Sequence, residues 1–487
     1  MGKSIFRNTI FKVLLNLCNI IIPVLVGPYI TRVLDKDVYG IYNATNASFF
    51  IFLTIGAFGI YNYGLREISR VRDDKEMTAK LFNELLVISL ISNALISVIY
   101  VAYALLTTTG TTTLLYGLFA IQFIGNAVYI EWVNEAMENY RFITLKTIII
   151  RLLYVAAIFI FVRKGTDLLP YTLIMSLTYT LNCLASFLYV SRSIRISFRG
   201  LHLLQHIKPL IMVFIIMNVN MLYTQTDKIM LGAFVNDVEV SVYQIPHYIM
   251  GMINSLAVAV AAVSIPRLSH VLHTEGFGAF RDLHQTVSHS FLFMLFPACM
   301  GVFCLSREVI VLYGSTKYLE CVLPMALFAL TYIPSAYSYL LGDVFLFLTG
   351  YERMLAFFNF IGGGINVLLN FVLIALGRFN ALTAVATLFI AYTAVGIICY
   401  LYIRLHLKIR VTLVDRTILR YFLLSLSFLP IVWLIKQLQF GPLFTSAIAI
   451  LVCGTLYCGV LILVKDSNMQ LILNKVFRPV KQLLHKK

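Results

Sequence analysis

The chain has 487 residues, of which 60% are hydrophobic and only 12% are charged. A soluble protein carries about 25% charged residues, so this composition excludes a large water-soluble domain. The formal net charge is +16 at pH 7, but the basic residues lie in short links between apolar runs, which argues against a nucleic-acid partner.

Fourteen apolar runs are each close to the length of about 20 residues that a helix needs to cross a bilayer. They are continuous rather than alternating, which favours helices over barrel strands. We therefore predict an all-α membrane protein with about 14 transmembrane helices. The predicted spans are 10–33, 41–63, 82–106, 114–134, 147–162, 169–190, 209–233, 242–265, 286–306, 322–348, 355–376, 381–403, 417–437 and 442–464.

The distribution of Lys and Arg sets the expected orientation. With both termini in the cytoplasm, 29 of the 38 Lys and Arg residues fall in inner segments and eight in outer links, while Lys228 lies inside a span. Cytoplasmic links carry such an excess of positive charge. We therefore expect a multi-pass membrane protein with both termini in the cytoplasm.

A weak internal repeat divides the chain. The link Val33–Tyr42 follows the first run, the link Phe234–Tyr243 follows the seventh, and each ends in a tyrosine that opens the next run. Transporters are often built from such repeats around a substrate path. We expect a six-helix lobe over 1–200, a second over 201–405, and two further helices with a basic tail over 406–487.

Polar side chains recur at helical spacing inside the apolar runs. Lipid-facing polar groups are costly, so such residues face a cavity or a neighbouring helix. Runs 1 and 2 correspond to runs 7 and 8 in the repeat, and these are the most polar pairs. The candidates for a central cavity are Arg7, Asn8, Lys12, Asn16, Asn43, Asn46, Arg151, Asn220, Asp227, Lys228, Gln244 and His247. The alternatives are that the amides only hold helices together, that the histidine is structural, and that Arg7, Lys12 and Arg151 lie at the membrane interface.

Three acidic residues, Asp227, Glu131 and Asp343, are candidates for coupling an ion to transport. Asp227 and Lys228 are neighbours on one helix, so they point about 100° apart and cannot pair with each other directly. Glu131, Glu135 and Glu138 end the fourth run, where a solvated inner face is the plainer interpretation.

Cofactor and metal motifs are not found in the sequence. His270 and His273 have no further ligand at metal spacing, and no phosphate-binding glycine loop occurs. Asp35-Lys-Asp37 has the D-x-D pattern of some glycosyltransferases, but it falls in an outer link. We expect no cofactor, no metal and no enzyme activity, and the cysteines inside apolar runs are expected to be small hydrophobic residues.

Several motifs resemble the polysaccharide repeat-unit flippases of the multidrug/oligosaccharidyl-lipid/polysaccharide exporter superfamily. They are Arg7-Asn8, Pro28-Tyr-Ile-Thr-Arg-Val-Leu34 with Tyr39-Gly40, Thr226-Asp-Lys-Ile-Met-Leu-Gly232, and Asn366-Val-Leu-Leu-Asn-Phe-Val-Leu-Ile374. The resemblance covers most of the chain and implies two six-helix lobes that alternate in access. It also implies the cargo, an undecaprenyl-pyrophosphate-linked oligosaccharide carried to the outer leaflet for capsular or O-antigen-like polysaccharide.

The implied partners are this lipid-linked oligosaccharide, membrane lipids, and a polysaccharide polymerase with its export machinery. Three alternatives stay open. A drug/cation antiporter generally uses an acid in its first lobe, where helix 1 here offers Lys12. A peptidoglycan-precursor flippase is a close relative. A polymerase or ligase usually carries a large outer loop, and every outer link here is short.

Overall fold

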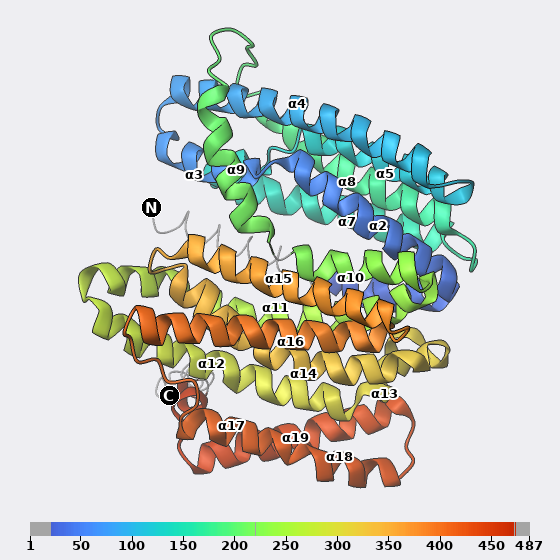
Figure 1. The fold of residues 1–487 in the computed structure, drawn as a ribbon, viewed down its shortest axis with the longest axis vertical. Coiled ribbons are helices and arrows are strands. Elements are labelled where there is room, and N and C mark those ends of the chain that lie inside the picture. Colours follow the sequence, from blue (N-terminus) through green and yellow to red (C-terminus); the bar gives the residue numbers. More distant parts are fainter. Residues whose placement is uncertain (1–20, 220, 472, 474–487) are drawn as a thin grey trace, which may run out of the picture. The chain divides into compact units, whose positions relative to one another are not determined.

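The computed structural model describes residues 21–219, 221–471 and 473, in which the only regular secondary structure is helix (Figure 1). Twelve helices in this part of the chain are long and apolar enough to cross a membrane. Each coincides with one predicted run. The pair Leu204–Asn218 and Tyr223–Phe234, bent by 70°, covers the seventh predicted run and would make a thirteenth span.

The predicted all-α membrane architecture is therefore confirmed, while the count of fourteen is not. The first predicted run, 10–33, begins outside the described residues, and the structure describes a helix over Ile21–Val33 from it. Apolar runs locate helices well because a bilayer of about 30 Å demands a minimum length from each crossing.

The chain forms two compact units, Met1–Ser241 and Val242–Lys487. The first unit contains α2 (Lys36–Ala57), α3 (Ile60–Val71), α4 (Lys75–Thr107), α5 (Thr111–Ala127), α6 (Glu131–Ala136), α7 (Tyr140–Phe161), α8 (Leu168–Ser191), α9 (Leu204–Asn218) and α10 (Met221–Phe234). The helix α11 (Asp237–Thr274) runs through the boundary. The predicted lobe boundaries at residues 200 and 405 stay predictions.

The second unit continues with shorter and longer helices. These are α12 (Phe277–Cys304), α13 (Ser306–Gly314), η1 (Thr316–Cys321), α14 (Val322–Tyr339), η2 (Leu340–Leu346), α15 (Glu352–Ala375), α16 (Ala381–Leu401), η3 (Tyr402–His406), α17 (Arg416–Leu426), α18 (Phe428–Gln437) and α19 (Pro442–Leu463). The segments η2 and η3 are π-helical.

Polar side chains inside the first unit tie its helices together. Asn126 on α5 donates to Asn93 Oδ1 on α4 at 2.7 Å and accepts from the Tyr179 hydroxyl on α8 at 3.0 Å. Asn93 in turn donates to the Gly56 carbonyl of α2 at 3.1 Å. Large apolar side chains such as Leu106 and Leu463 remain exposed, at 85% and 82%. Polar interiors with apolar exteriors are typical of helices that pack within lipid.

The two repeat-related links contact each other inside the first unit. The Ser241 hydroxyl donates to the Lys36 carbonyl at 2.8 Å. A Cβ on Gly40 would lie 1.8 Å from the Asp237 carbonyl oxygen. Glycine at position 40 therefore lets the start of α2 meet the start of α11 backbone to backbone, which explains the Tyr39-Gly40 motif.

We expect Gly40→Ala to lower the stability of the protein by about 3 kcal/mol, because overpacking against fixed backbone is destabilising. The measurement is the apparent melting temperature of the purified protein. Gly117→Ala on α5 is the matched control, since nothing lies within 4 Å of its added Cβ. A helical alanine there is expected to be neutral or slightly stabilising. Equal effects of the two changes would contradict this packing.

Candidate functional site

The most polar part of the seventh predicted run is α10, which carries Asp227 and Lys228. Both are buried, with 0% and 5% of their surfaces exposed. The motif that contains them ends at Gly232, whose added Cβ would lie 3.1 Å from the Ala44 Cβ on α2 and 3.5 Å from Val240. Glycine at position 232 thus lets α10, the helix that carries both charged residues, lie close against α2.

The predicted residues on α2 and α7 occupy the same unit. Asn43 is buried and donates to the Tyr39 carbonyl of its own helix at 2.6 Å, while Asn46 and Arg151 are half-buried. α2 packs against α10, so the structure brings Asn43 and Asn46 onto a helix that contacts the one with Asp227 and Lys228.

Gln244 and His247 lie on α11 in the second unit, where the His247 ring packs against Tyr243 and Phe328 with centroids 5.9 and 5.5 Å away. Asp343 lies in the π-helical segment η2 of the same unit. The remaining candidates, Arg7, Asn8, Lys12, Asn16 and Asn220, lie outside the described residues. The cavity set as a whole stays a prediction.

Glu131 differs from its expected solvated position. Its carboxylate Oε2 lies 2.8 Å from Lys146 Nζ, and the two side chains are 9% and 4% exposed. Ser186 accepts from Lys146 at 2.6 Å and donates to the same carboxylate oxygen. The interpretation of Glu131 as part of a solvated face was wrong, because α7 begins at Tyr140 and carries Lys146 into contact with it.

Glu135 and Glu138 follow Glu131 in α6 and just beyond it. Glu135 accepts a hydrogen bond from the Tyr61 hydroxyl at 2.8 Å, and exposed Glu138 pairs with Arg72 at 2.9 Å. Only Glu138 therefore matches a solvated face.

Two buried charged residues of the first unit were missed from the sequence. Lys146 precedes the fifth predicted run, which begins at residue 147, so hydropathy places it outside the membrane-spanning part of the chain. Glu84 is an acid inside the third predicted run, which is a signal that could have found it. Glu84 is 2% exposed and contacts His206 on α9.

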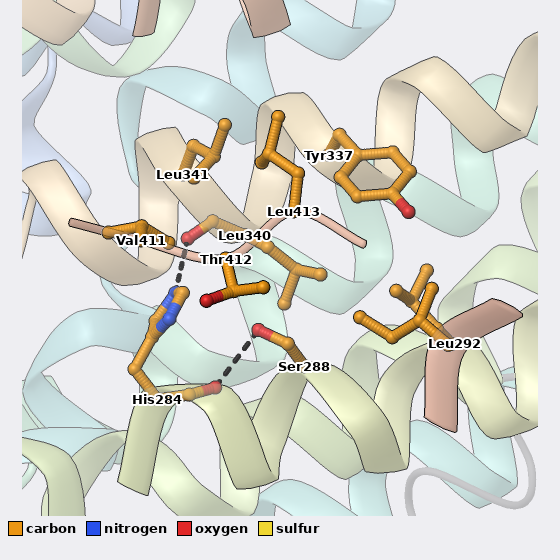
Figure 2. Close-up of a pocket in the computed structure, with 10 residues that line it drawn as sticks. His284, Ser288, Leu292, Tyr337, Leu340, Leu341, Val411, Thr412 and Leu413 are labelled. Atoms are coloured by element: carbon orange, nitrogen blue, oxygen red, sulfur yellow. Dashed lines mark hydrogen bonds between the residues drawn. The ribbon is translucent and has the colours of Figure 1, made fainter. Parts of the chain in front are cut away.

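In the second unit the link before α17 folds onto α12, as Figure 2 shows. The His284 side chain points from α12 to the Leu340 carbonyl oxygen, 2.9 Å from Nε2, at the start of η2. Val411, Thr412 and Leu413 of the link lie beside it around a cavity of about 10 Å³. That volume is about one water molecule, so this pocket cannot hold a sugar.

Asp415, at the end of this link, forms hydrogen bonds to α12 and to the start of α17. Its Oδ1 accepts from the Ile418 amide at 2.8 Å, and its Oδ2 accepts from Gln285 at 3.0 Å and contacts His289. Partial burial disfavours the charged form, but these hydrogen bonds outweigh it and lower the pKa of Asp415 below its ordinary value. The carboxylate therefore caps α17 and ties it to α12.

We expect acid to weaken this attachment. The folded pKa of Asp415 is depressed, so its contribution to stability is present above the unfolded pKa of about 3.9 and is lost as the pH falls through the folded value. Asp415→Asn keeps the cap and removes the charge, so it should cost about 1 kcal/mol near neutral pH. Melting temperatures of both proteins between about pH 7 and pH 3 should converge on acidification. A constant difference would contradict the assignment.

Residues 5–272 of the chain match the family described as polysaccharide biosynthesis protein. The chain belongs to this family. The chain is also 22% identical over 166 residues to an Escherichia coli (strain K12) protein that is named as an O-antigen transporter. This match covers 34% of the present chain and 40% of the length of its relative.

Solved structures of other proteins share the fold of this chain. The inward closed conformation of the lipid II flippase MurJ superposes with a TM-score of 0.71 at 14% identity, covering 93% of this chain and 100% of that one. An inward-facing multidrug resistance MATE family transporter superposes with a TM-score of 0.57 at 13% identity. The match covers 79% of this chain and 97% of that one. At these identities the likeness concerns the fold. The described residues contain no group of three or more His, Cys, Asp or Glu that could hold a metal ion.

Proposed function

We propose that this protein is a flippase that moves undecaprenyl-pyrophosphate-linked oligosaccharide repeat units from the inner to the outer leaflet of the cytoplasmic membrane. The units would serve capsular or O-antigen-like polysaccharide synthesis. The family match carries the proposal, and the likeness in fold to a lipid II flippase over 93% of the chain supports it. The O-antigen transporter name of the relative points to the same cargo class.

A flippase is needed because the head group of the cargo cannot cross the bilayer unaided. An ionised pyrophosphate bearing sugars cannot cheaply enter hydrocarbon, where an isolated charge costs tens of kcal/mol in the Born limit. A hydrated cavity with fixed cations lowers that barrier while the lipid tail stays in the bilayer. We assign Lys12 and Lys228, with Arg7 and Arg151, to the pyrophosphate, and the candidate asparagines to the sugars.

The proposed arrangement follows the predicted repeat. Lobes over 1–200 and 201–405 would open alternately to each side, with residues 406–487 as an added pair of helices and a basic tail. Both termini would lie in the cytoplasm, and the excess of Lys and Arg in the predicted inner segments supports this orientation. A polysaccharide polymerase would take the units on the outer side.

Two alternative functions correspond to proteins of similar fold: a peptidoglycan-precursor flippase and a drug/cation antiporter. Cells lacking the protein distinguish them. The proposal predicts loss of surface polysaccharide with unchanged sensitivity to cationic drugs, and failure of the protein to replace a missing lipid II flippase. Normal surface polysaccharide with raised drug sensitivity would favour the antiporter, and rescue of the lipid II defect would favour the peptidoglycan precursor as cargo.

A further inference from the structure

His206, near the start of α9, lies between a carboxylate and a phenol inside the first unit. Its Nε2 is 2.8 Å from Glu84 Oε2 on α4, and its Nδ1 is 2.8 Å from the Tyr63 hydroxyl on α3. Glu84, His206 and Tyr63 are 2%, 5% and 7% exposed. Both ring nitrogens therefore have partners, and bulk water has little access to either.

The Glu84 carboxylate also accepts hydrogen bonds from two other residues of the segment around the start of α9. The His202 amide donates to Oε1 at 2.9 Å, and Gln205 Nε2 donates to Oε2 at 3.3 Å. Near Tyr63 and Glu84, the other charged groups are Arg66, Glu67 and Arg70 on α3 and Lys80 on α4. Arg66, Arg70 and Lys80 are exposed, so water and dissolved salt weaken their effect on the buried cluster.

Apolar packing makes this contact the docking point of α9. Leu210, one turn after His206, is fully buried in a cluster with Ile60 of α3 and Leu85 of α4. A Cβ on Gly59, between α2 and α3, would lie 3.0 Å from the Phe214 amide nitrogen. The backbone of α9 thus approaches the break between α2 and α3 closely, and His206 supplies the polar part of the same interface.

The hydrogen bonds around His206 accommodate one additional proton without moving a heavy atom. In the neutral ring, Nε2–H donates to Glu84 and Nδ1 accepts from the Tyr63 hydroxyl. A proton that binds the Nδ1 lone pair makes Nδ1 the donor, and Tyr63 turns its hydroxyl hydrogen away and accepts. The net charge of the cluster changes from −1 to 0, and the contact with Glu84 becomes a charge-assisted hydrogen bond.

We propose that Glu84, His206 and Tyr63 form a proton-binding site whose occupancy tightens the docking of α9 on the first unit. By linkage, docking then favours protonation to the same degree. α9 is the first part of the bent pair whose second part carries Asp227 and Lys228. A role in driving transport rests on the proposed function, whereas proton binding and docking do not.

The test is amide hydrogen exchange of residues 198–210 in the full chain in lipid nanodiscs, corrected for intrinsic rates. At about pH 5.5 the wild type should exchange roughly tenfold more slowly than at about pH 8, because the bound proton strengthens the docking of α9. His206→Gln keeps a donor and an acceptor but cannot bind the proton. It should lose the pH dependence and retain the protection seen at the higher pH.

His202→Gln is the matched control, since His202 is exposed and contributes only its backbone amide. It should behave as the wild type does. Glu84→Gln should also abolish the pH dependence, so the test does not depend on one variant folding. Wild-type protection that does not change with pH, or a pH dependence that survives in both variants, would overturn the proposal. Because exchange is read without cargo, failure here leaves the flippase assignment untouched, and failure of export leaves this site untouched.

Discussion

Replacement of Glu131 by alanine is expected to lower the free energy of unfolding by about 3–5 kcal/mol, the typical cost of removing one partner from a buried ion pair. Lys146 would keep its hydrogen bonds to the Ser186 hydroxyl at 2.6 Å and to the Asn182 carbonyl at 3.4 Å. Its positive charge, however, would lose the carboxylate that balances it. Lys146→Ala should be comparably damaging, because it leaves a buried carboxylate.

The measurement is the apparent melting temperature of the purified protein, together with its abundance in membranes. Replacing both charges by apolar residues of similar size, Glu131→Leu with Lys146→Met, should recover most of the loss. The exposed pair of Arg72 and Glu138 provides the control, since Glu138→Ala should change stability by no more than about 0.5 kcal/mol. A double variant as unstable as the worse single variant would show that the charges do not compensate each other.

Replacement of Lys228 by methionine should reduce export of surface polysaccharide by about tenfold or more. Methionine retains the length of the side chain and removes the charge that we assign to the pyrophosphate. A loss of about 1.4 kcal/mol of favourable interaction already corresponds to a factor of ten. The readout is the amount of surface polysaccharide in cells that lack the native protein and express the variant.

Controls must separate cargo binding from folding, because Lys228 is buried beside Asp227. Lys228→Arg keeps the positive charge and should retain more export than Lys228→Met at equal membrane abundance. Lys208→Met removes an exposed lysine from α9 and should leave export near the wild-type level. Full export by Lys228→Met at normal abundance would remove Lys228 from the cargo path.

The helical membrane fold was largely predictable because the length and apolarity of each span are properties of local sequence. All twelve single spans of the described chain fall on predicted runs. The bend between Asn218 and Tyr223 was not predicted, since the apolar run continues through it and contains no proline at that point. A break of this kind depends on how neighbouring helices pack, and the composition of the run carries no information about that packing.

The candidate site was predicted less completely, and for a different reason. Polar spacing made Asp227 and Lys228 candidates, and the structure buries both, while their place in a cavity stays a prediction. Hydropathy could not pair Glu131 with Lys146, because the pairing depends on which faces of α6, α7 and α8 meet. Hydropathy also could not predict the contact between Glu84 and His206, which are 122 positions apart in the chain. Such long-range contacts arise from the three-dimensional arrangement of helices.

The central claim is that this protein carries complete lipid-linked units across the membrane, and one measurement tests it most directly. In cells lacking the protein, lipid-linked oligosaccharides are extracted and their leaflet is assigned by access of an impermeant sugar-modifying reagent from either side. If the protein is the proposed flippase, complete units accumulate facing the cytoplasm and surface polysaccharide is lost. Complete units stranded on the outer face would contradict it and would place the defect after translocation, at a polymerase or ligase step.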